Sequence, residues 1–432
     1  MLTANRGNPK GLPIFFKMDY SKVLFEKIRR RRARVGIIGI GYVGDALGKG
    51  ARGAGFDVLG LTRDPEKAKR INSDKSFGYS ATSNIEDLKR CDIVCICVPT
   101  PIKNDKTPDL DPLVSSLAKT SKILTPATLV IIESTVAAGT TRNIVLPILK
   151  MSGLSEEKDF YLSFSPERVD PGNLNYGINN TPKVVSGLSI TSKNLTHLFY
   201  SSFIESVVSV SSLETAEMSK LLENAYRFIN ISFMNELLDY ANSLGVNLWE
   251  VIEAASSKPF GFMPHYPGPG IGGHCIPVDP YYLLDDAKKR GIELGILERA
   301  GFVNDLQPRK VVEKTIEVLK KTNGVKNSHS ALLVGISYKE DTPDNRESPS
   351  LIIWSLLKEN KIKVDYHDPY FPAYNGARSI DLSSPTINKK DIIVLTTPHS
   401  TIDYERIISL GKPIIDTKNA LKNYSYPHIY RI

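Results

Sequence analysis

The chain has 432 residues, of which 41% are hydrophobic and 24% are charged, a composition typical of soluble globular proteins. This length predicts two or three domains of roughly 100 to 200 residues each. The formal charge of +8 admits nucleic acid, a membrane surface or anionic small molecules as partners. No apolar run approaches the roughly 18 residues that a spanning helix needs. No secretory signal is recognisable, so we expect a cytosolic protein without a membrane partner.

The cysteines exclude two further classes of protein. Cys91, Cys95 and Cys97 lie close together in an apolar, strand-like run, and Cys275 lies far from them. This spacing gives neither a disulfide framework nor paired metal ligands, so we expect a reducing compartment and no metal site.

Residues 1–30 form a basic leader that contains the start of a short amphipathic helix, expected from Asp19 to Arg34. The arginines at its end could form a nucleic-acid arm. No aromatic or basic pattern elsewhere supports such an arm, so we expect a solvated helix end and no nucleic-acid partner.

A dinucleotide-binding pattern follows. An apolar strand beginning at Val35 runs into Gly39-x-Gly41-x-x-Gly44, and a helical pattern leads to a second strand at residues 56–61. Glycines at these positions let the backbone turn tightly and approach a pyrophosphate at the helix N-terminus. Further strand-like runs, separated by helical patterns, cover residues 93–98 and 129–132.

The end of the second strand departs from this pattern. A carboxylate is expected there to bind the adenosine ribose, but the best-aligned residue is Thr62, followed by Arg63 and Asp64. Arginine can neutralise a 2'-phosphate, which makes NADP an alternative to NAD, although Asp64 could reach the ribose if the strand ends later. The charge of Asp45 could oppose the pyrophosphate, so we expect this residue to point away and cap the helix.

Two loops close this half of the chain. Residues 133–142 leave a strand and place hydroxyl groups at its carboxyl end, where open α/β sheets bind ligands. Residues 164–173 bring a carboxylate, a guanidinium and turn residues into one loop. Ordinary turn chemistry explains either loop equally well when it is judged alone.

A long helix is predicted from a capping box at Ser211-Ser-Leu-Glu214 through Leu238. Lys220 and Asn224 are four residues apart, so they share one face of this helix. A lone lysine there would otherwise be interpreted as a solvated side chain. A helix of this length between two domains predicts a linker and a dimer surface.

Cys275 lies in a loop, residues 267–280, that is rich in glycine and proline. This composition disfavours regular structure and lets the backbone lie close to a ligand. A thiol in such a loop is a candidate nucleophile rather than a packing residue. His274 is its neighbour, and Asp279 is close enough in sequence to share the same site.

From about Ser328 a second strand and helix pattern begins. Lys339 and Arg346 flank a helix N-terminus within the loop 337–349, which suits a phosphate-bearing ligand other than the dinucleotide. The predicted strands cover residues 331–336, 362–366, 391–396 and 413–416, with a helix at 348–358.

The whole pattern predicts an α/β protein in which two Rossmann-like parallel-sheet domains are joined by a central helical segment with a long linking helix. The expected parts are the basic leader 1–30, a dinucleotide-binding domain 31–210, a central segment 211–325 with the cysteine loop, and a C-terminal domain 326–432.

From about Arg32 to its C-terminus, the chain resembles the nucleotide-sugar 6-dehydrogenases, which act on UDP-glucose, UDP-N-acetylglucosamine and UDP-N-acetylmannosamine. Two motifs, Ser-Pro-Glu-Arg-Val-Asp-Pro-Gly-Asn and Pro-Phe-Gly-Phe-Met-Pro, are most similar to the branch acting on UDP-N-acetylhexosamines, especially UDP-N-acetylglucosamine. The motifs that carry the family resemblance are Gly-Tyr-Val-Gly (41–44), Val-Pro-Thr-Pro (98–101), Glu-Ser-Thr-Val (133–136), Ser-Pro-Glu-Arg (165–168), Ser-Lys-Leu-Leu-Glu-Asn (219–224), Gly-Gly-His-Cys-Ile-Pro-Val-Asp-Pro (272–280) and Arg-Glu-Ser-Pro (346–349).

The resemblance implies a four-electron oxidation of the sugar C6 alcohol to a carboxylate, with two nicotinamide cofactors used in turn. Cys275 would add to the intermediate aldehyde and later form a thioester. Lys220 and Asn224 would stabilise the oxygen that becomes anionic. By the same resemblance, Asp279 and Thr135 would position a water, and Glu167 would help to activate it or organise its loop.

The resemblance also implies the binding residues, a UDP-sugar substrate, a homodimer or larger homo-oligomer, and no metal. For the cofactor, NAD or alternatively NADP, the expected residues are Gly39, Gly41, Tyr42, Val43, Gly44, Thr62, Arg63, Pro99, Thr100 and Thr135. For the substrate they are Glu167, Arg168, Lys220, Asn224, Phe262, Tyr266, Gly272, Lys339 and Arg346.

Three alternatives stay open. The substrate could be UDP-glucose or UDP-N-acetylmannosamine. A two-electron hydroxyacid dehydrogenase would share the N-terminal fold and a lysine-asparagine helix, but it has no use for Cys275 or the C-terminal domain. A non-catalytic nucleotide-binding scaffold would be consistent with Thr62 and Asp45, but not with the set of residues around Cys275.

Overall fold

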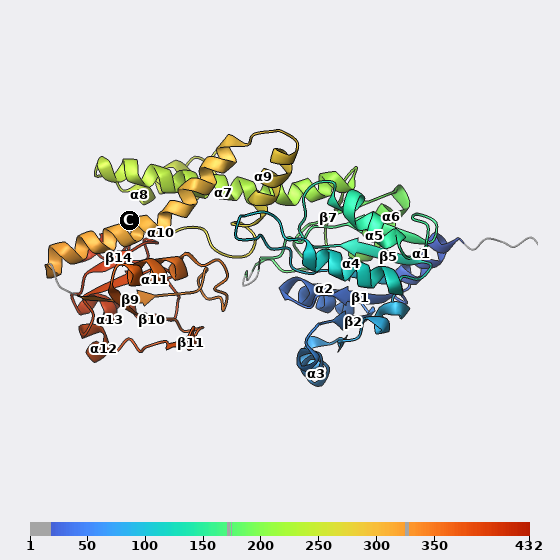
Figure 1. Ribbon diagram of the computed structural model, residues 1–432, viewed down its shortest axis with the longest axis horizontal. Coiled ribbons are helices and arrows are strands. Elements are labelled where there is room, and N and C mark those ends of the chain that lie inside the picture. The colour runs from blue at the N-terminus through green and yellow to red at the C-terminus, as the bar shows by residue number, and fades with distance from the viewer. Residues whose placement is uncertain (1–18, 171–172, 174, 325–327) are drawn as a thin grey trace, which may run out of the picture.

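Two parallel sheets lie at opposite ends of the molecule, and two long helices run between them (Figure 1). The structure is a computed structural model that describes residues 19–170, 173, 175–324 and 328–432. Residues 1–18 of the expected leader lie outside the described residues. The predicted fold class, two parallel-sheet domains joined by long central helices, is confirmed.

The N-terminal sheet has eight strands in the order β3-β2-β1-β4-β5-β6-β7-β8. All neighbouring pairs are parallel except β6 and β7. Strand β1 therefore lies between β2 and β4, where the chain direction across the sheet reverses and open α/β sheets bind ligands. The strands are β1 (Arg34–Ile38), β2 (Asp57–Leu61), β3 (Ser80–Thr82), β4 (Ile93–Ile96), β5 (Thr128–Ile132), β6 (Phe160–Phe164), β7 (Lys183–Gly187) and β8 (Val207–Ser209).

Helices cover both faces of this sheet and enclose two apolar cores. Leu24 and Ile28 of the first helix are fully buried in one core, together with Phe199. Residues 20–29 therefore pack into this domain, although the sequence placed them in the leader. The helix does not reach Arg34 as predicted, because Arg34 begins β1. The helices are α1 (Tyr20–Arg29), α2 (Tyr42–Gly53), α3 (Pro65–Ser73), α4 (Asp111–Ile123), α5 (Leu146–Lys150) and α6 (Ile190–Tyr200), with short helical turns η1 (Lys75–Phe77), η2 (Ile85–Arg90) and η3 (Thr141–Val145).

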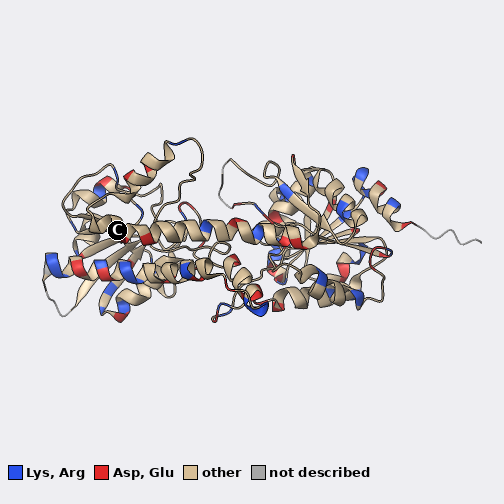
Figure 2. Cartoon of the chain, turned by 90° about the horizontal axis from the view of Figure 1, so that it is seen from above, with Lys and Arg blue, Asp and Glu red and all other residues tan. Residues whose placement is uncertain are grey.

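Helices α7 (Leu213–Ser243) and α10 (Gly295–Asn323) pack side by side and connect the two lobes (Figure 2). The predicted capping box is wrong by one residue, because the hydroxyl of Ser212, not that of Ser211, accepts the N–H of Thr215 at the start of α7. Between the two long helices lie α8 (Leu248–Ser256), the cysteine loop and α9 (Asp279–Lys289).

The C-terminal sheet has five parallel strands in the order β10-β9-β13-β14-β15. The second half of α10 contributes Val311, Val312 and Leu319 to its core. The strands are β9 (His329–Val334), β10 (Ile362–His367), β13 (Ile392–Leu395), β14 (Ile414–Asp416) and β15 (Ile429–Arg431). The helices are α11 (Pro349–Glu359), α12 (Ser384–Asn388) and α13 (Tyr404–Ser409), and a small hairpin joins β11 (Ala373–Tyr374) to β12 (Ala377–Arg378).

Within the described ranges, none of the helices combines the length and the apolar character that crossing a membrane would require.

Candidate active site

The cysteine loop is held between the start of α9 and the C-terminal domain. The carbonyl oxygen of Cys275 accepts the N–H groups of Val278 at 3.1 Å and Asp279 at 2.9 Å. Gly273 has a φ of +93°, and a Cβ there would lie 2.7 Å from the ring of Tyr338. Its N–H donates to the carbonyl of Arg346 at 3.0 Å. Glycine is therefore required at position 273, because the loop backbone is pressed against the C-terminal domain.

The long helix α7 brings Lys220 and Asn224 to this loop. The side-chain amide of Asn224 donates to Asp279 Oδ2 at 2.5 Å. Asp279 is buried, and its desolvation raises the pKa of the carboxyl to about 6, against the opposing effects of the Lys220 charge and the Asn224 hydrogen bond. The predicted grouping of Lys220, Asn224, Asp279 and Cys275 is thus present in space.

Cys275 is accessible at the surface, yet the protein atoms around its sulfur raise the pKa of the thiol by desolvation. The positive charge of Lys220 is the strongest opposing influence, while Asp279 raises the pKa further. Lys220 is therefore the cation that favours the thiolate, the reactive form of cysteine. Desolvation also lowers the pKa of the neighbouring His274, and Arg346 adds to this effect.

The loop that carries Thr135 is anchored on two sides. It leaves the carboxyl end of β5, and the hydroxyl of Ser134 donates to the carbonyl of Val98 at 2.7 Å. On the other side, the buried carboxylate of Glu217 in α7 accepts the N–H groups of Gly139 at 2.6 Å and Thr141 at 2.7 Å. These bonds fix the half-buried Thr135 relative to α7, which carries Lys220.

Glu167 belongs to a buried ionic cluster that the sequence did not reveal. Lys183, the first residue of β7, contacts Glu133 at 2.5 Å and Glu167 at 3.1 Å, and Tyr200 donates its hydroxyl to Glu133. The other carboxylate oxygen of Glu167 accepts the N–H groups of residues 168 and 169. Desolvation alone would raise the pKa of Glu167, but Lys183 and these backbone donors lower it overall. Desolvation raises the pKa of Glu133 despite Lys183.

Several predicted substrate residues form contacts across the space between the domains. Arg168 pairs with Glu223 of α7 at 2.7 Å. Lys339 of the C-terminal domain pairs with Asp170 of the N-terminal domain at 3.0 Å. The guanidinium of Arg346 lies 5.8 Å from the ring centre of Tyr42.

The remaining predicted substrate residues lie near the cysteine loop. Arg346 also pairs with Asp344 at 2.6 Å, and a Cβ on Gly272 would lie 2.8 Å from that of Tyr338. Phe262 and Tyr266 are exposed, and the Tyr266 ring stacks on Trp249 of α8 with the ring centres 5.2 Å apart.

The three glycines after β1 have the properties that a dinucleotide requires. Gly39 has a φ of +95°, and a Cβ there would lie 2.7 Å from the carbonyl oxygen of Cys97. A Cβ on Gly41 would meet no atom within 4 Å, so the backbone is open to an approaching pyrophosphate. A Cβ on Gly44 would lie 2.2 Å from the Gly39 carbonyl oxygen, which requires glycine where helix and strand pack. These residues fit a bound nicotinamide dinucleotide.

The other predicted cofactor residues surround this turn. Tyr42 and Val43 begin α2, which has Gly41 as its N-cap and no capping side chain. Its first N–H groups are therefore available to a phosphate. Thr100 is buried in the loop after β4, which also holds Pro99, and its carbonyl accepts the hydroxyl of Tyr282 at 2.9 Å.

The structure corrects the expected role of Asp45 and excludes the alternative in which a longer β2 brings Asp64 to the ribose. Asp45 does not cap α2, because it lies within the first turn, where it accepts the Tyr79 hydroxyl and pairs with Lys49, both at 2.8 Å. Strand β2 ends at Leu61, and the Asp64 side chain accepts the N–H of Glu66 as the N-cap of α3. The later strand end that would bring Asp64 to the ribose is thus absent.

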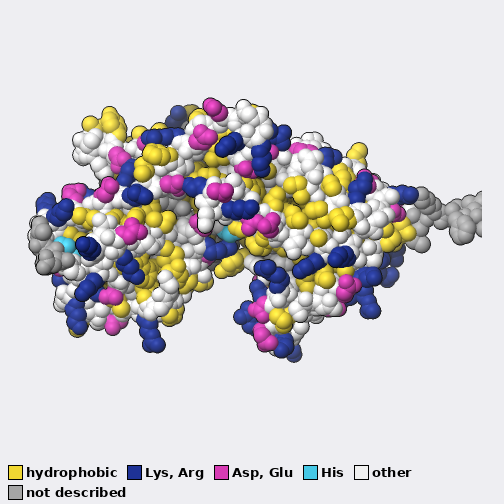
Figure 3. Space-filling view, in the orientation of Figure 1, with side chains coloured by type: hydrophobic (Ala, Val, Ile, Leu, Met, Phe, Trp, Pro, Cys, Tyr) yellow, Lys and Arg dark blue, Asp and Glu magenta, His cyan; other side chains and the backbone are white. Residues whose placement is uncertain are grey.

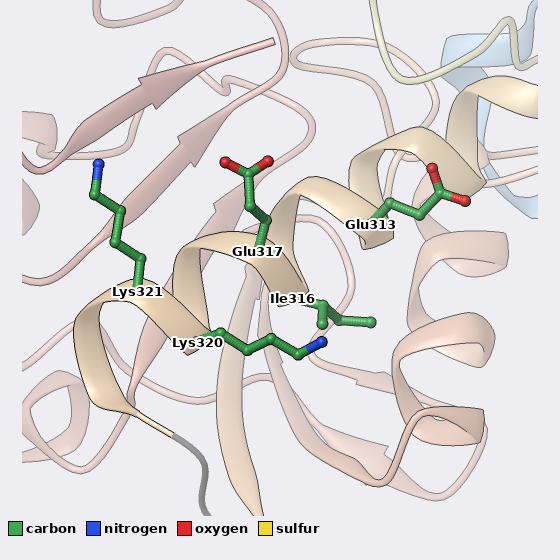
Figure 4. A pocket seen from close by; sticks show the side chains of 5 residues that line it. All are labelled: Glu313, Ile316, Glu317, Lys320 and Lys321. Carbon is green, nitrogen blue, oxygen red and sulfur yellow. The ribbon is translucent and has the colours of Figure 1, made fainter.

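A surface hollow on α10 has no contact with this site. Its lining comes from the C-terminal half of the helix and mixes both charges: Glu313, Ile316, Glu317, Lys320 and Lys321 (Figure 4). Glu317 already pairs with Lys314 at 3.0 Å. We assign this hollow no catalytic role.

Models of three domains of the UDP-glucose/GDP-mannose dehydrogenase family match this chain in order. The NAD binding domain matches residues 75–204, the central domain 214–306 and the UDP binding domain 332–423. A model for the NAD binding domain of D-isomer specific 2-hydroxyacid dehydrogenases also matches, but only over residues 17–111.

Curated relatives match nearly the whole chain. A UDP-N-acetyl-D-mannosamine dehydrogenase of Pyrococcus horikoshii is 33% identical, over 92% of this chain and 98% of the relative. A UDP-N-acetyl-D-glucosamine 6-dehydrogenase of Pseudomonas aeruginosa is 34% identical, over 88% of this chain and 94% of the relative. Among solved structures, that of a UDP-D-ManNAc dehydrogenase from Pyrococcus horikoshii superposes with a TM-score of 0.85 at 31% identity, covering 92% of this chain and 99% of that one.

Proposed function

Because the chain belongs to the UDP-glucose/GDP-mannose dehydrogenase family, we propose that it oxidises the C6 hydroxyl of UDP-N-acetylglucosamine to a carboxylate. As a member of this family it is an NAD-binding nucleotide-sugar 6-dehydrogenase. The proposal rests on one observation: the accessible Cys275 lies close to Lys220 and to the buried, hydrogen-bonded pair of Asn224 and Asp279.

The thiol explains how one site removes four electrons. Oxidation of the C6 alcohol gives an aldehyde, and the Cys275 thiolate adds to its carbon, so that an S–C bond forms and the carbonyl oxygen becomes an alkoxide. Loss of a second hydride from C6 converts this thiohemiacetal into a thioester. Water then breaks the S–C bond, which releases the carboxylate and regenerates the thiol. When bound, a nicotinamide dinucleotide would supply the hydride acceptor for the first oxidation, and a second oxidised molecule would replace the reduced one for the second oxidation.

The neighbouring residues have separate tasks. The Lys220 ammonium favours the thiolate and stabilises the alkoxide, whose charge develops only during the reaction. Asn224 orients the Asp279 carboxylate through its hydrogen bond. A carboxyl with a pKa of about 6 is ionised at neutral pH but retains basicity, so Asp279, with Thr135, suits the positioning of the hydrolytic water.

We assign Glu167 to loop organisation rather than to water activation. One of its oxygens accepts two backbone N–H groups, and the other contacts Lys183. An oxygen committed in this way is poorly placed to take a proton from water. Glu167 instead keeps the loop with Arg168 next to α7, where Arg168 pairs with Glu223.

The UDP group would bind between the domains, near Lys339 and Arg346. Both cations already contact acidic residues, so a diphosphate would join existing ion networks. On the face seen in Figure 3, basic and acidic side chains are interspersed. This distribution suits a small anionic substrate better than nucleic acid, which requires a continuous basic stripe.

The choice of sugar rests on two motifs, at residues 165–173 and 259–264, that resemble those of the branch acting on UDP-N-acetylhexosamines, especially UDP-N-acetylglucosamine. A relative named for that substrate is 34% identical, and one named for UDP-N-acetyl-D-mannosamine is 33% identical. The two sugars differ only in configuration at C2. The chemistry at C6 is therefore the same for both, and contacts to the acetamido group must discriminate between them.

A substrate comparison tests this choice. UDP-N-acetylglucosamine, UDP-N-acetylmannosamine and UDP-glucose are each supplied with NAD and with NADP, and cofactor reduction is followed by absorbance. We expect the highest kcat/KM for UDP-N-acetylglucosamine, and weaker use of UDP-glucose because it lacks the acetamido group. A higher kcat/KM for either other sugar would reassign the substrate. Because Arg63 follows β2, we also expect activity with NADP as well as with NAD.

A two-electron hydroxyacid dehydrogenase is less well supported. Its cofactor-domain model matches only residues 17–111, whereas the central and UDP binding models account for the remainder of the site. Such an enzyme would reduce one cofactor per substrate and would not need Cys275.

A further inference from the structure

Two basic residues beside the dinucleotide turn have no acidic partner among the residues that the structure describes. Arg63 follows β2 and is exposed, with neither an ion pair nor a hydrogen bond from its guanidinium in that part of the chain. Lys67 lies in the first turn of α3, and its ammonium group donates a hydrogen bond to the carbonyl oxygen of Ile40 at 2.5 Å. This bond uses one of three donors, so two remain for a ligand.

Two other cations of the same region, Lys69 and Lys49, are paired with carboxylates. Lys69 contacts Glu66 at 2.8 Å, and Lys49 contacts Asp45 at the same distance. Exposed lysines commonly form such neighbouring pairs at little gain in stability. Arg63 and Lys67 differ from these two lysines, because neither has a carboxylate partner among the described residues.

The carboxylate that would hold the two ribose hydroxyls of NAD is missing here. Thr62 occupies its position, and its hydroxyl accepts the N–H of Asp64 at 3.3 Å. The Asp64 carboxylate in turn accepts the N–H of Glu66 at 2.9 Å and caps α3. The turn after β2 therefore offers a hydroxyl and a guanidinium where NAD-specific sites offer a carboxylate.

Lys67 links this turn to the glycine loop. Ile40, whose carbonyl it contacts, immediately precedes Gly41, the glycine whose backbone faces open space. The Lys67 ammonium is thus held beside the glycine loop, whereas Arg63 follows the end of β2, where the adenosine ribose lies in this kind of fold. A phosphate on the ribose 2'-oxygen would therefore lie near the residues that follow β2.

We propose that Arg63 and Lys67 form a 2'-phosphate subsite and that the enzyme prefers NADP to NAD. Arg63 can bind the phosphate oxygens through its planar fork, and Lys67 supplies a point charge. This inference rests on the proposed function only for the use of a nicotinamide dinucleotide, and not for the identity of the sugar, because the subsite concerns the adenosine half of the cofactor.

Binding of cofactor fragments to the full chain tests the subsite without catalysis. Isothermal titration calorimetry compares adenosine 2',5'-bisphosphate with 5'-ADP as probes. We expect the wild-type protein to bind the bisphosphate about tenfold more tightly, and Arg63→Ala or Lys67→Ala each to lose about five- to tenfold of bisphosphate affinity. The affinity for 5'-ADP should change by less than about twofold in both variants.

Lys69→Ala is the matched control, because Lys69 lies on the same helix but is paired with Glu66. It should leave both affinities unchanged. Thr62→Asp, which restores a carboxylate, should reverse the preference toward 5'-ADP. Equal binding of the two probes by the wild type, or an Arg63→Ala/Lys67→Ala protein with the wild-type ratio, would overturn the proposal.

Steady-state kinetics test the cofactor preference during catalysis, independently of fragment binding. We expect kcat/KM for NADP to exceed that for NAD, with the order reversed in Thr62→Asp. If no UDP-sugar is oxidised but the probe preference is present, the proposed function fails and the subsite stands. If sugar oxidation proceeds with NAD while the probes bind equally, only the subsite fails.

Discussion

Asp279 is buried beside Asn224, with a pKa of about 6 that places its ionisation close to neutral pH. In an unfolded chain an aspartate has a pKa of about 4. Because the folded pKa is the higher one, the protonated carboxyl contributes stability that is fully present below about pH 4 and is lost as the pH rises through about 6. Catalysis requires the opposite form, because only the ionised carboxylate can position and activate water.

We therefore predict an acidic limb in the pH profile of kcat, with an apparent pKa near 6. Asp279→Asn should lower kcat by about 10²- to 10⁴-fold and abolish this limb, while thermal unfolding shows the variant to be folded. Binding of 5'-ADP serves as the control and should be unchanged. An unaltered limb in the Asn variant would assign the titration to another group.

At the scale of elements, α7 has a second apolar face that the monomer leaves uncovered. Leu222, Tyr226, Phe233 and Tyr240 are spaced by four, seven and seven residues, so they lie along one side of the helix. Their exposed fractions are 61%, 45%, 51% and 64%. Exposed apolar rows of this kind mark protein interfaces, and we propose that α7 forms the dimer contact.

The dimer proposal predicts the effect of charge on this row. Leu222→Glu combined with Phe233→Glu should convert a dimer to a monomer, because two buried carboxylates would be desolvated without partners. Sedimentation velocity at one fixed protein concentration measures the change. Phe25→Glu on α1, where the side chain is 41% exposed, is the control and should remain dimeric. A monomeric wild type, or a dimeric double variant, would contradict the proposal.

For the molecule as a whole, local patterns predicted the fold class and many of the elements, but not strands β3, β6, β7, β8 and β15 or the contacts between distant segments. The glycine turn and the strands around it were predictable because their residue types report backbone conformation directly. Helix α10 was missed, since Pro308 interrupts a pattern that tertiary packing nevertheless keeps helical. Its second half packs into the C-terminal core, so the central segment is continuous with that domain.

In the candidate site too, residues within motifs were predictable, whereas contacts between residues far apart in the sequence were not. Cys275, Lys220 and Asn224 were recognised from their motifs. Lys183 was not, because its partners lie 16 and 50 residues away and only the folded sheet brings them together. The one local signal was an ionisable residue at the head of an apolar run, Lys-Val-Val-Ser. The short chain of bonds from Glu217 to the Thr135 loop was equally invisible in the sequence.

The central claim is that a cysteine captures the half-oxidised sugar so that a single pocket oxidises it twice. The direct measurement is the number of cofactor equivalents reduced per UDP-sugar consumed, together with the product formed, for the wild type and for Cys275→Ser. We predict two equivalents and a carboxylate for the wild type. For the variant we predict at most one equivalent, an aldehyde-level product trapped by hydroxylamine, and unchanged dinucleotide binding. One equivalent with free aldehyde from the wild type, or full carboxylate production by the variant, would contradict the account.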